Sequence, residues 1–289
     1  MILQKEIATI AEEKLVSKST IDKDWVLGHF LAAIYSDPEL RDTLIFKGGT
    51  CLKKCYFPDY RFSEDLDFTS REKKFELSKK HLQQICQHVK DHAGVMTHID
   101  SLRPLKHKDE LTGYEAIIRF WGADHPRNDA PPPAERWLTR IKIEIILYEL
   151  LVFPESGRAI THNYSDKITL ESAQIPCYSI EEMLAEKIRA LIQRSYTAPR
   201  DFYDIWFLQK QYPDLDFSKI VEAFHKKMKF KNLEFTDVDQ LINDENDKAL
   251  RASWKNSLAH QIQAEALPEF DEVKRELEEL FSEMFGEGS

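Results

Sequence analysis

The chain has 289 residues, which is long enough for two domains, and 42% of them are hydrophobic, which allows a substantial core. Charged residues make up 31% and glycines number only 9, so the composition excludes a fibrous or disordered protein and favours a helix-rich globular enzyme. The net charge of −10 resides in residues 234–289, which hold 15 acidic and 5 basic residues, so the charge does not exclude a basic groove for nucleic acid elsewhere.

The first part of the chain is predicted to mix helices and strands. Apolar residues recur every three or four positions in the helical segments and every second position in the strands. The predicted elements are helices 2–16 and 23–36, strand 44–47, a helix capped by Thr50 and running to about Tyr56, strand 65–69, helix 73–92, and strands 96–102, 114–121 and 138–148.

The remainder of the chain is predicted to be helical, after a domain hinge at Pro176. The predicted helices are 180–195, 201–211, 217–229 and 267–284. We therefore expect a mixed α/β domain with N-terminal helices over residues 1–175 and a helical C-terminal domain over residues 176–289.

Two features bear on location. No apolar run has transmembrane length, and the charged segment 1–14 is unlike a signal peptide. The four cysteines form no CxxC pair, so neither a zinc site nor a disulfide framework is expected. We expect a cytoplasmic protein without membrane contact.

The predicted strand 65–69 carries a pair of acids. Because successive side chains of a strand point to opposite faces, Asp65 and Asp67 share one face and Leu66 and Phe68 share the other. Two adjacent carboxylates repel unless a cation lies between them, and hard oxygen ligands suit Mg²⁺, or Mn²⁺ in its place. The competing interpretation is a solvated polar strand face. The apolar residues that pin the strand favour the metal site.

A glycine turn precedes this strand. Gly48 and Gly49 let main-chain N–H groups approach an anion closely, and the helix that starts at Thr50 directs its positive end to the same place. An ordinary turn is the competing interpretation, but the order of strand, glycine pair, helix, strand and DxD is more specific than either motif alone. Arg61 and Ser63, just before the acidic strand, are either loop residues or part of a nucleotide site.

A third carboxylate is expected on a neighbouring strand. Glu144 shares a strand face with Lys142 and Arg140, and the opposite face is all isoleucine. We favour a metal ligand or base for Glu144, with a surface ladder of charges as the alternative. Lys142 is more typical of a salt bridge than of catalysis.

The helical domain offers a second set of charges. Lys187 and Arg194 share a helix face, as do Asp201 and Asp204 on the next helix. A lysine that reaches a triphosphate and is oriented by an aspartate is one interpretation. An interhelical salt bridge is the other.

Three further groupings carry less weight. Cys51 and Cys55 are expected to be small core residues, and the pair His88 and His92 lacks the glutamate and third ligand of a zinc enzyme. A basic cluster is predicted to be either a solvated helix face or an RNA contact. It consists of Lys226, Lys227, Lys229 and Lys231.

Together these motifs resemble the AbiEii/AbiGii toxin family of nucleotidyltransferases, which includes the MenT toxins. The resemblance covers roughly residues 20–210. Its five blocks are GG[ST]xLxK at Gly48 to Lys54, RxSxDxDF at Arg61 to Phe68, the strand Lys142 to Ile145, Glu186-Lys187 to Leu191, and Arg200-Asp201 to Ile205.

The resemblance implies a DNA polymerase β-like nucleotidyltransferase core with a mixed sheet and a helical C-terminal domain. It implies an NTP substrate, Mg²⁺, a cognate antitoxin and a role in toxin–antitoxin or abortive-infection systems. MenT-like members add nucleotides to the 3′ end of tRNA. The implied catalytic residues are Asp65, Asp67, Glu144, Lys187 and Asp204, of which the first three hold metal. The implied nucleotide-binding residues are Gly48, Gly49, Thr50, Lys54, Arg61, Ser63, Lys142, Arg194 and Asp201.

Two departures from the family pattern concern the site. Glu144 stands where many relatives carry aspartate, and Thr50 stands where serine is frequent. The leading hypothesis is transfer of a nucleotide to tRNA. The alternatives are transfer to a protein or small molecule, and a catalytically silent module that binds nucleotide or antitoxin.

Overall fold

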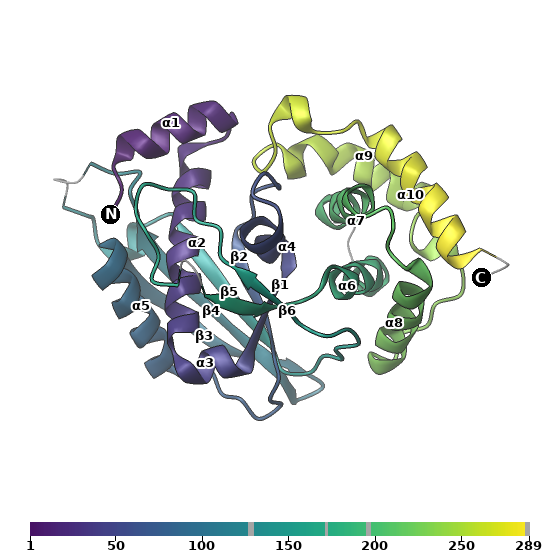
Figure 1. Cartoon of the computed structure of the whole chain (residues 1–289), viewed down its shortest axis with the longest axis horizontal. Helices are drawn as coiled ribbons and strands as arrows, with labels where there is room; N and C mark the ends of the chain where they lie inside the picture. Colours follow the sequence, from purple (N-terminus) through teal and green to yellow (C-terminus); the bar gives the residue numbers. More distant parts are fainter. Residues whose placement is uncertain (127–129, 171–172, 195–197, 287–289) are drawn as a thin grey trace. The chain divides into compact units, whose positions relative to one another are not determined.

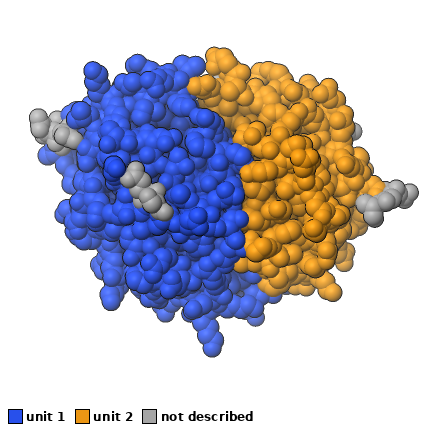
Figure 2. All heavy atoms as spheres, viewed as in Figure 1, with its two compact units in different colours: residues 1–149, 155–177 blue, residues 150–154, 178–289 orange. Residues whose placement is uncertain are grey.

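A computed structural model of the chain describes residues 1–126, 130–170, 173–194 and 198–286. The chain divides into two compact units (Figure 2). Unit 1 comprises residues 1–149 and 155–177, and unit 2 comprises residues 150–154 and 178–289.

Unit 1 is built on a mixed sheet of seven strands, counted within the described residues, in the order β3-β4-β5-β2-β1-β7-β6 (Figure 1). The β1–β7 and β2–β5 pairs are parallel and the other neighbours are antiparallel. The strands are β1 (Leu44–Lys47), β2 (Asp65–Ser70), β3 (Met96–His107), β4 (Glu110–Trp121), β5 (Arg140–Ile146), β6 (Ser156–Ala159) and β7 (Gln174–Cys177). This confirms the predicted mixed α/β fold.

The helices of unit 1 precede or interrupt the sheet. They are α1 (Gln4–Lys14), α2 (Lys18–Ser36), α3 (Pro38–Thr43), α4 (Gly48–Cys51) with the π-helical turn η1 (Leu52–Tyr56), α5 (Lys79–Ala93) and the 3₁₀ turn η2 (Ala134–Arg136). Ser17 caps helix α2 by accepting a hydrogen bond from the Thr20 main-chain N–H. Ser78 caps helix α5 by accepting one from the His81 main-chain N–H.

One face of the sheet is covered and apolar. Figure 1 shows α2 and α5 together on that face, and α2 contacts α5 and β5 while α5 contacts β3. The side chains that point to the helices are fully buried, among them Leu66, Phe68 and Ile143. Since strand side chains alternate, the polar residues between them point to the opposite face, where the acids of β2 and β5 lie.

Unit 2 is helical in its described residues. The 14-residue helix α6 packs against α7 and α8, and α7 contacts α9 and α10. The helices are α6 (Ile180–Gln193), α7 (Pro199–Gln211), α8 (Phe217–Phe230), α9 (Asp244–Leu258) and α10 (Phe270–Phe285), with 3₁₀ turns η3 (Val238–Gln240) and η4 (Ala264–Ala266). Residue 195, expected to end α6, lies outside the described residues.

Several elements differ from the prediction. Strand β1 has the predicted bounds, but β3 and β4 form a hairpin that extends well past the predicted ends. Helix α5 starts at Lys79 rather than residue 73, because Ser78 supplies its cap. The short elements α3, β6 and β7 and the weakly patterned α9 were missed. Pro176, predicted as a hinge, lies inside β7, one residue before Cys177, the last residue of unit 1, and its carbonyl accepts a hydrogen bond from the Tyr35 hydroxyl.

Among the described residues, no helix combines the length and the apolar character that crossing a membrane requires.

Candidate nucleotidyltransferase site

The glycine pair lies against the acidic strand. Gly48 has φ +81°, a conformation that favours glycine, and a Cβ on it would lie 2.6 Å from Asp67 Oδ2. A Cβ on Gly49 would lie 2.8 Å from an Arg61 guanidinium nitrogen and 3.0 Å from Ser63 Oγ. The backbone conformation therefore favours glycine at Gly48, and the structure brings the turn, Arg61, Ser63 and Asp67 together.

Thr50 does not cap the following helix, contrary to the prediction. The N-cap position belongs to Lys47, because the helix already begins at Gly48. Thr50 lies within the first turn, buried, and its hydroxyl donates a hydrogen bond of 2.5 Å to the main-chain carbonyl of Asp65. Thr50 thus fixes the glycine turn to the start of β2.

The three predicted carboxylates lie on neighbouring strands. Asp67 of β2 pairs in register with Glu144 of β5, and Asp65 pairs with Lys142. The side chains of Asp65 and Glu144 are 40% and 30% exposed, so both are accessible to a ligand. Sheet register therefore assembles an acidic cluster, Asp65, Asp67 and Glu144, around the predicted DxD motif.

Register also adds residues that the sequence analysis missed. One row of paired residues crosses five strands, from Lys47 through Asp67, Glu144 and Glu115 to Arg103. Arg103 and Glu115 form an ion pair of 2.7 Å at one end of the row. Lys47 is buried at the other end, and its charge acts to lower the pKa of Asp67. The position of Lys47 directly before the glycines was the available signal.

Lys142 lies among the acids. Its ammonium is 3.3 Å from Glu144 Oε2 and 3.6 Å from Asp65 Oδ2, as the salt-bridge interpretation expected. Burial alone would lower the pKa of Lys142, but the charges of Asp65, Glu144 and Asp67 outweigh it and raise that pKa. Lys142 offsets part of the negative charge of the three acids, and the buried Lys47 adds positive charge near Asp67.

Burial raises the pKa of Asp67 to about 6, with further contributions from the negative charges of Asp65 and Glu144. A divalent cation would remove this unfavourable interaction, so the donor set fits Mg²⁺ chemically. The three carboxylates do not converge, however. Within the described residues, the groups with three ligand atoms all within 4.8 Å of one another are Cys51, Cys55 and Cys177, and His29, His162 and Asp166.

Lys54 lies elsewhere than the acidic cluster. Its ammonium is buried and forms a 2.6 Å ion pair with Asp24 of α2, which also accepts a hydrogen bond from the Tyr164 hydroxyl. The charge of Lys54 lowers the pKa of Asp24 despite burial, which acts to raise it. The family resemblance implied that Lys54 binds nucleotide, but the turn η1 directs it into the unit.

The predicted charges of the helical region form a cluster of their own in unit 2. Lys187 Nζ lies 2.5 Å from Asp204 Oδ2 and 3.2 Å from Asp201 Oδ1, and Arg194 lies 2.8 Å from Asp201 Oδ2. Asp204 is fully buried and the Lys187 side chain is 12% exposed. These ion pairs hold the ammonium of Lys187 in a fixed orientation. They agree with both interpretations of Lys187, as a phosphate contact and as an interhelical salt bridge.

The predicted basic cluster of α8 is not a uniform solvated face. Lys227 is fully buried, 2.5 Å from Glu182 Oε1, and donates a hydrogen bond to the Leu150 carbonyl. Lys226 is exposed and pairs with Glu222 on the same helix. Lys227 therefore cannot contact RNA, because its position in the helix directs it to α6. Cys51 and Cys55 are buried, which confirms their assignment to the core.

Comparisons with known proteins match this architecture. The MenT4 nucleotidyltransferase toxin of Mycobacterium tuberculosis H37Rv superposes with a TM-score of 0.66 at 17% identity, covering 98% of this chain and 90% of that chain. A putative nucleotidyltransferase from H. pylori superposes with a TM-score of 0.57 at 16% identity, covering 93% and 96%. At these identities the likeness concerns the fold. A search of curated proteins found no match.

A family model identifies the chain more directly. The model describes the nucleotidyl transferase AbiEii toxin of type IV toxin–antitoxin systems, and it matches residues 29–276. The match spans most of the sequence, including both the acidic cluster and the helical unit, and it confirms the resemblance drawn from the motifs. The chain therefore belongs to the AbiEii family of nucleotidyltransferase toxins.

Proposed function

We propose that this toxin transfers a nucleoside monophosphate from an NTP to the 3′ end of tRNA in a Mg²⁺-dependent reaction. The observation that carries the proposal is the pairing of Asp67 with Glu144 in register, with Gly48 packed against Asp67. This arrangement joins the acidic cluster to main-chain N–H groups that suit a phosphate.

The acidic cluster has a defined role in the proposal. Asp65, Asp67 and Glu144 would hold Mg²⁺, which would offset charge on the attacking and leaving oxygens of an in-line displacement. Lys142, already paired with Asp65 and Glu144, would hold those two carboxylates in orientation. The raised pKa of Asp67, about 6, would then fall when a cation binds.

The residues around the glycine turn would bind the triphosphate. Gly48 and Gly49 expose main-chain N–H groups at the start of a helix, and Arg61 and Ser63 lie directly beside Gly49. Thr50 would act indirectly, since its hydroxyl is committed to the Asp65 carbonyl. In the reaction, the acceptor 3′-hydroxyl oxygen bonds to the α-phosphorus and pyrophosphate leaves.

The cluster of unit 2 would stabilise the leaving group. Lys187, oriented by Asp204 and Asp201, would present a fixed positive charge to the departing pyrophosphate. Arg194, 39% exposed and paired with Asp201, would add a second cation. Lys54 is not assigned to this role, because Asp24 already neutralises it.

Two alternatives remain from the sequence. The same chemistry directed at a protein or small molecule would use an identical acidic cluster, so only the acceptor distinguishes it. A silent module that binds nucleotide or antitoxin would not require three acids on neighbouring strands. We further propose a cytosolic location and a cognate antitoxin partner, as the toxin–antitoxin family implies.

One experiment separates these functions. The protein is incubated with each α-labelled NTP, Mg²⁺ and total cell lysate, and the labelled product is treated with nuclease or protease. We expect label in tRNA, at the 3′ end, and lost when the terminal nucleotides are removed. Label in protein would support the alternative acceptor. No label with any NTP, beside an active nucleotidyltransferase control, would support the silent module.

A further inference from the structure

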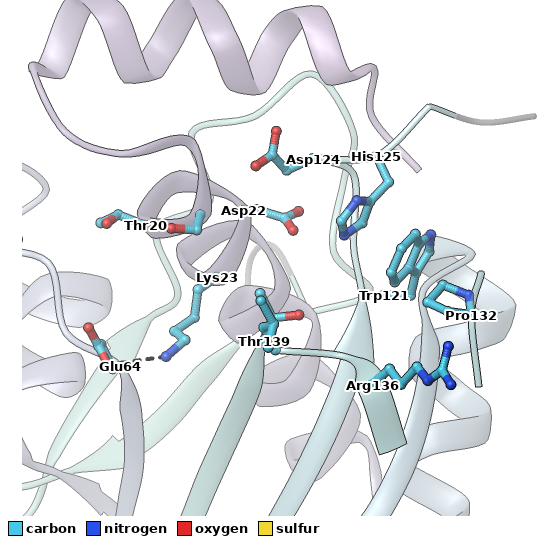
Figure 3. A pocket seen from close by; sticks show the side chains of 12 residues that line it. Thr20, Asp22, Lys23, Glu64, Trp121, Asp124, His125, Pro132, Arg136 and Thr139 are labelled. Carbon is cyan, nitrogen blue, oxygen red and sulfur yellow. Dashed lines mark hydrogen bonds and ion pairs between the residues drawn. The ribbon is translucent and has the colours of Figure 1, made fainter. Parts of the chain in front are cut away.

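A large pocket lies in unit 1 at the end of the sheet where β2 and β5 begin. Its volume is about 640 Å³, and its lining comes from the start of α2, the end of β4 and the segments that lead into β2 and β5 (Figure 3). Glu64, on the wall, directly precedes Asp65, so their Cα atoms are about 3.8 Å apart. The pocket therefore lies next to the start of β2, the strand that carries Asp65 and Asp67.

One wall of the pocket is aromatic and apolar. Trp121 and His125 stack with ring centroids 3.6 Å apart and an interplanar angle of 12°, and Figure 3 shows them side by side. Leu138, also on the wall, is 94% exposed, an unusual position for a large apolar side chain. A flat stack beside an exposed leucine provides a surface on which another planar ring can pack.

Three charged residues of the lining have an unmet interaction within the described residues. Asp124 and Arg136 form no ion pair with any described residue, and the buried Asp22 has one carboxylate oxygen, Oδ2, that accepts no hydrogen bond within the described chain. Lys23, by contrast, is paired with Glu64 at 3.1 Å. Asp124 and Asp22 thus offer carboxylate acceptors for N–H donors, and Arg136 offers a cation.

These properties define the ligand. Stacking on an aromatic side chain suits any nucleobase, whereas carboxylate acceptors select bases that carry an exocyclic amino group. A single cation, Arg136, matches one phosphate rather than a run of duplex backbone. A base can enter such a pocket only when it is unpaired, because base pairing occupies the same edge.

We propose that this pocket binds one unpaired nucleobase of the acceptor RNA, a base with an exocyclic amino group, and so positions the strand beside Asp65. The amino group would donate to Asp124 or Asp22, the ring would extend the Trp121–His125 stack, and Leu138 would cover its edge. The proposal rests on the proposed RNA acceptor, and it adds a specificity site distinct from the site for the incoming NTP.

Direct binding tests the proposal without catalysis. Fluorescein-labelled hexamers of adenosine and of uridine are titrated with the full-length protein, and anisotropy is recorded in the absence of NTP. Uracil lacks an amino group, so the adenosine hexamer should bind about tenfold tighter. Trp121→Ala should weaken its binding about tenfold, the usual effect of removing one stacking partner.

Leu138→Ala provides a variant whose folding is not in question, because the side chain is already 94% exposed. It should weaken adenosine hexamer binding several-fold. Leu111→Ala, which removes another exposed leucine from unit 1, 42% exposed and outside the pocket, should bind as the wild type does. Equal affinity of the Leu138→Ala and Leu111→Ala proteins, or equal affinity for the two hexamers, would overturn the proposal.

Two further outcomes distinguish this inference from the proposed function. If label enters RNA in the transfer assay while Trp121→Ala and Leu138→Ala bind the hexamer normally, the pocket assignment alone is wrong. If label enters only protein while both substitutions still weaken hexamer binding, the transfer proposal alone is wrong and the pocket remains an RNA site. Displacement of the hexamer by an equal concentration of AMP would overturn the strand-binding assignment.

Discussion

The two charged clusters of the molecule differ in charge balance and in exposure. In unit 1, three acids, Asp65, Asp67 and Glu144, lie with two lysines, Lys142 and the buried Lys47, and two of the acids are about a third exposed. The unit 2 cluster consists of Lys187, Arg194, Asp201 and Asp204, so its charges balance. Its two acids are at most 7% exposed.

The difference shows how each cluster is suited to a ligand. Balanced buried pairs satisfy one another, so they hold Lys187 in place and gain little from an added ion. The unbalanced cluster retains repulsion, which adds to the larger effect of burial in raising the pKa of Asp67. The acids of unit 1 are therefore suited to bind an added cation. The acids of unit 2 instead orient the ammonium of Lys187, a cation that belongs to the chain itself.

The largest effect should come from the unbalanced cluster. Asp67→Ala should abolish Mg²⁺-dependent transfer, because it removes the acid that lies between the glycine turn and Glu144. The same substitution relieves repulsion, so the melting temperature should not fall. Transfer is measured with labelled NTP, and stability by thermal unfolding.

Asp100→Ala is a suitable control for that experiment. Asp100 is an acid of β3 whose partner is Arg119, and its loss should leave transfer unchanged. Full transfer by a folded Asp67→Ala protein would show that the acidic cluster is a solvated strand face. A large loss of stability would show that Asp67 holds the fold together.

The next largest effect should come from the balanced cluster. Lys187→Ala should reduce transfer about 10²–10³-fold, the usual effect of removing one preorganised donor at a site of developing charge. Asp204→Ala should resemble it, because Asp204 lies 2.5 Å from the Lys187 ammonium and orients it. The double variant should be little worse than either single one. Lys187→Arg should restore activity only in part, since a planar fork does not replace a point charge.

Rate measurements with each variant decide between the two interpretations of Lys187. Lys210→Ala, on the same helix as Asp204 but paired with Glu276, should transfer at the wild-type rate. If the losses of Lys187→Ala and Asp204→Ala simply multiply, Asp204 does not act through Lys187. Normal transfer by Lys187→Ala would make the lysine a structural ion pair.

The sequence was most informative where short-range rules decide the structure. The alternation of β2 placed Asp65 and Asp67 on one face, and strand β1 with its glycine turn was predicted at the correct residues. In both places the pattern depends on residues within a few positions of one another, so no knowledge of tertiary packing was needed.

Longer-range contacts escaped prediction for a physical reason. Lys54 pairs with Asp24, which lies 30 residues away, and Lys227 pairs with Glu182 of another helix. A lysine in a helix has no sequence signature that separates a buried ion pair from a phosphate contact or a solvated face. The row from Lys47 to Arg103 likewise depends on sheet register, which is fixed only when distant strands pair.

The smallest expected effect is a change in the free energy of unfolding when either of two neighbouring acids of α2, Asp22 or Asp24, is replaced. Asp24 has Lys54 within 2.6 Å, and its pKa is lowered despite burial. Asp22 is equally buried and forms no ion pair with the described residues, and burial raises its pKa from 3.8 to about 7. The two acids should therefore respond in opposite ways to the same change, aspartate to asparagine.

The sign of each response follows from linkage. A raised pKa in the folded state means that Asp22 stabilises the fold below about pH 4 and that this contribution is lost as the pH rises toward 7. Asp22→Asn removes this loss, and at about pH 8 it should raise the free energy of unfolding by between about 1 and 4 kcal/mol. At about pH 4 the gain should vanish.

Asp24→Asn should instead lower stability at about pH 8, because Lys54 is left buried without its partner. Urea unfolding of the wild type and both variants at the two pH values measures these differences. Asp22 also accepts a hydrogen bond from the Ala123 main-chain N–H. Equal destabilisation by both substitutions at about pH 8 would show that this hydrogen bond, and not the absence of a neighbouring cation, decides what Asp22 contributes to stability.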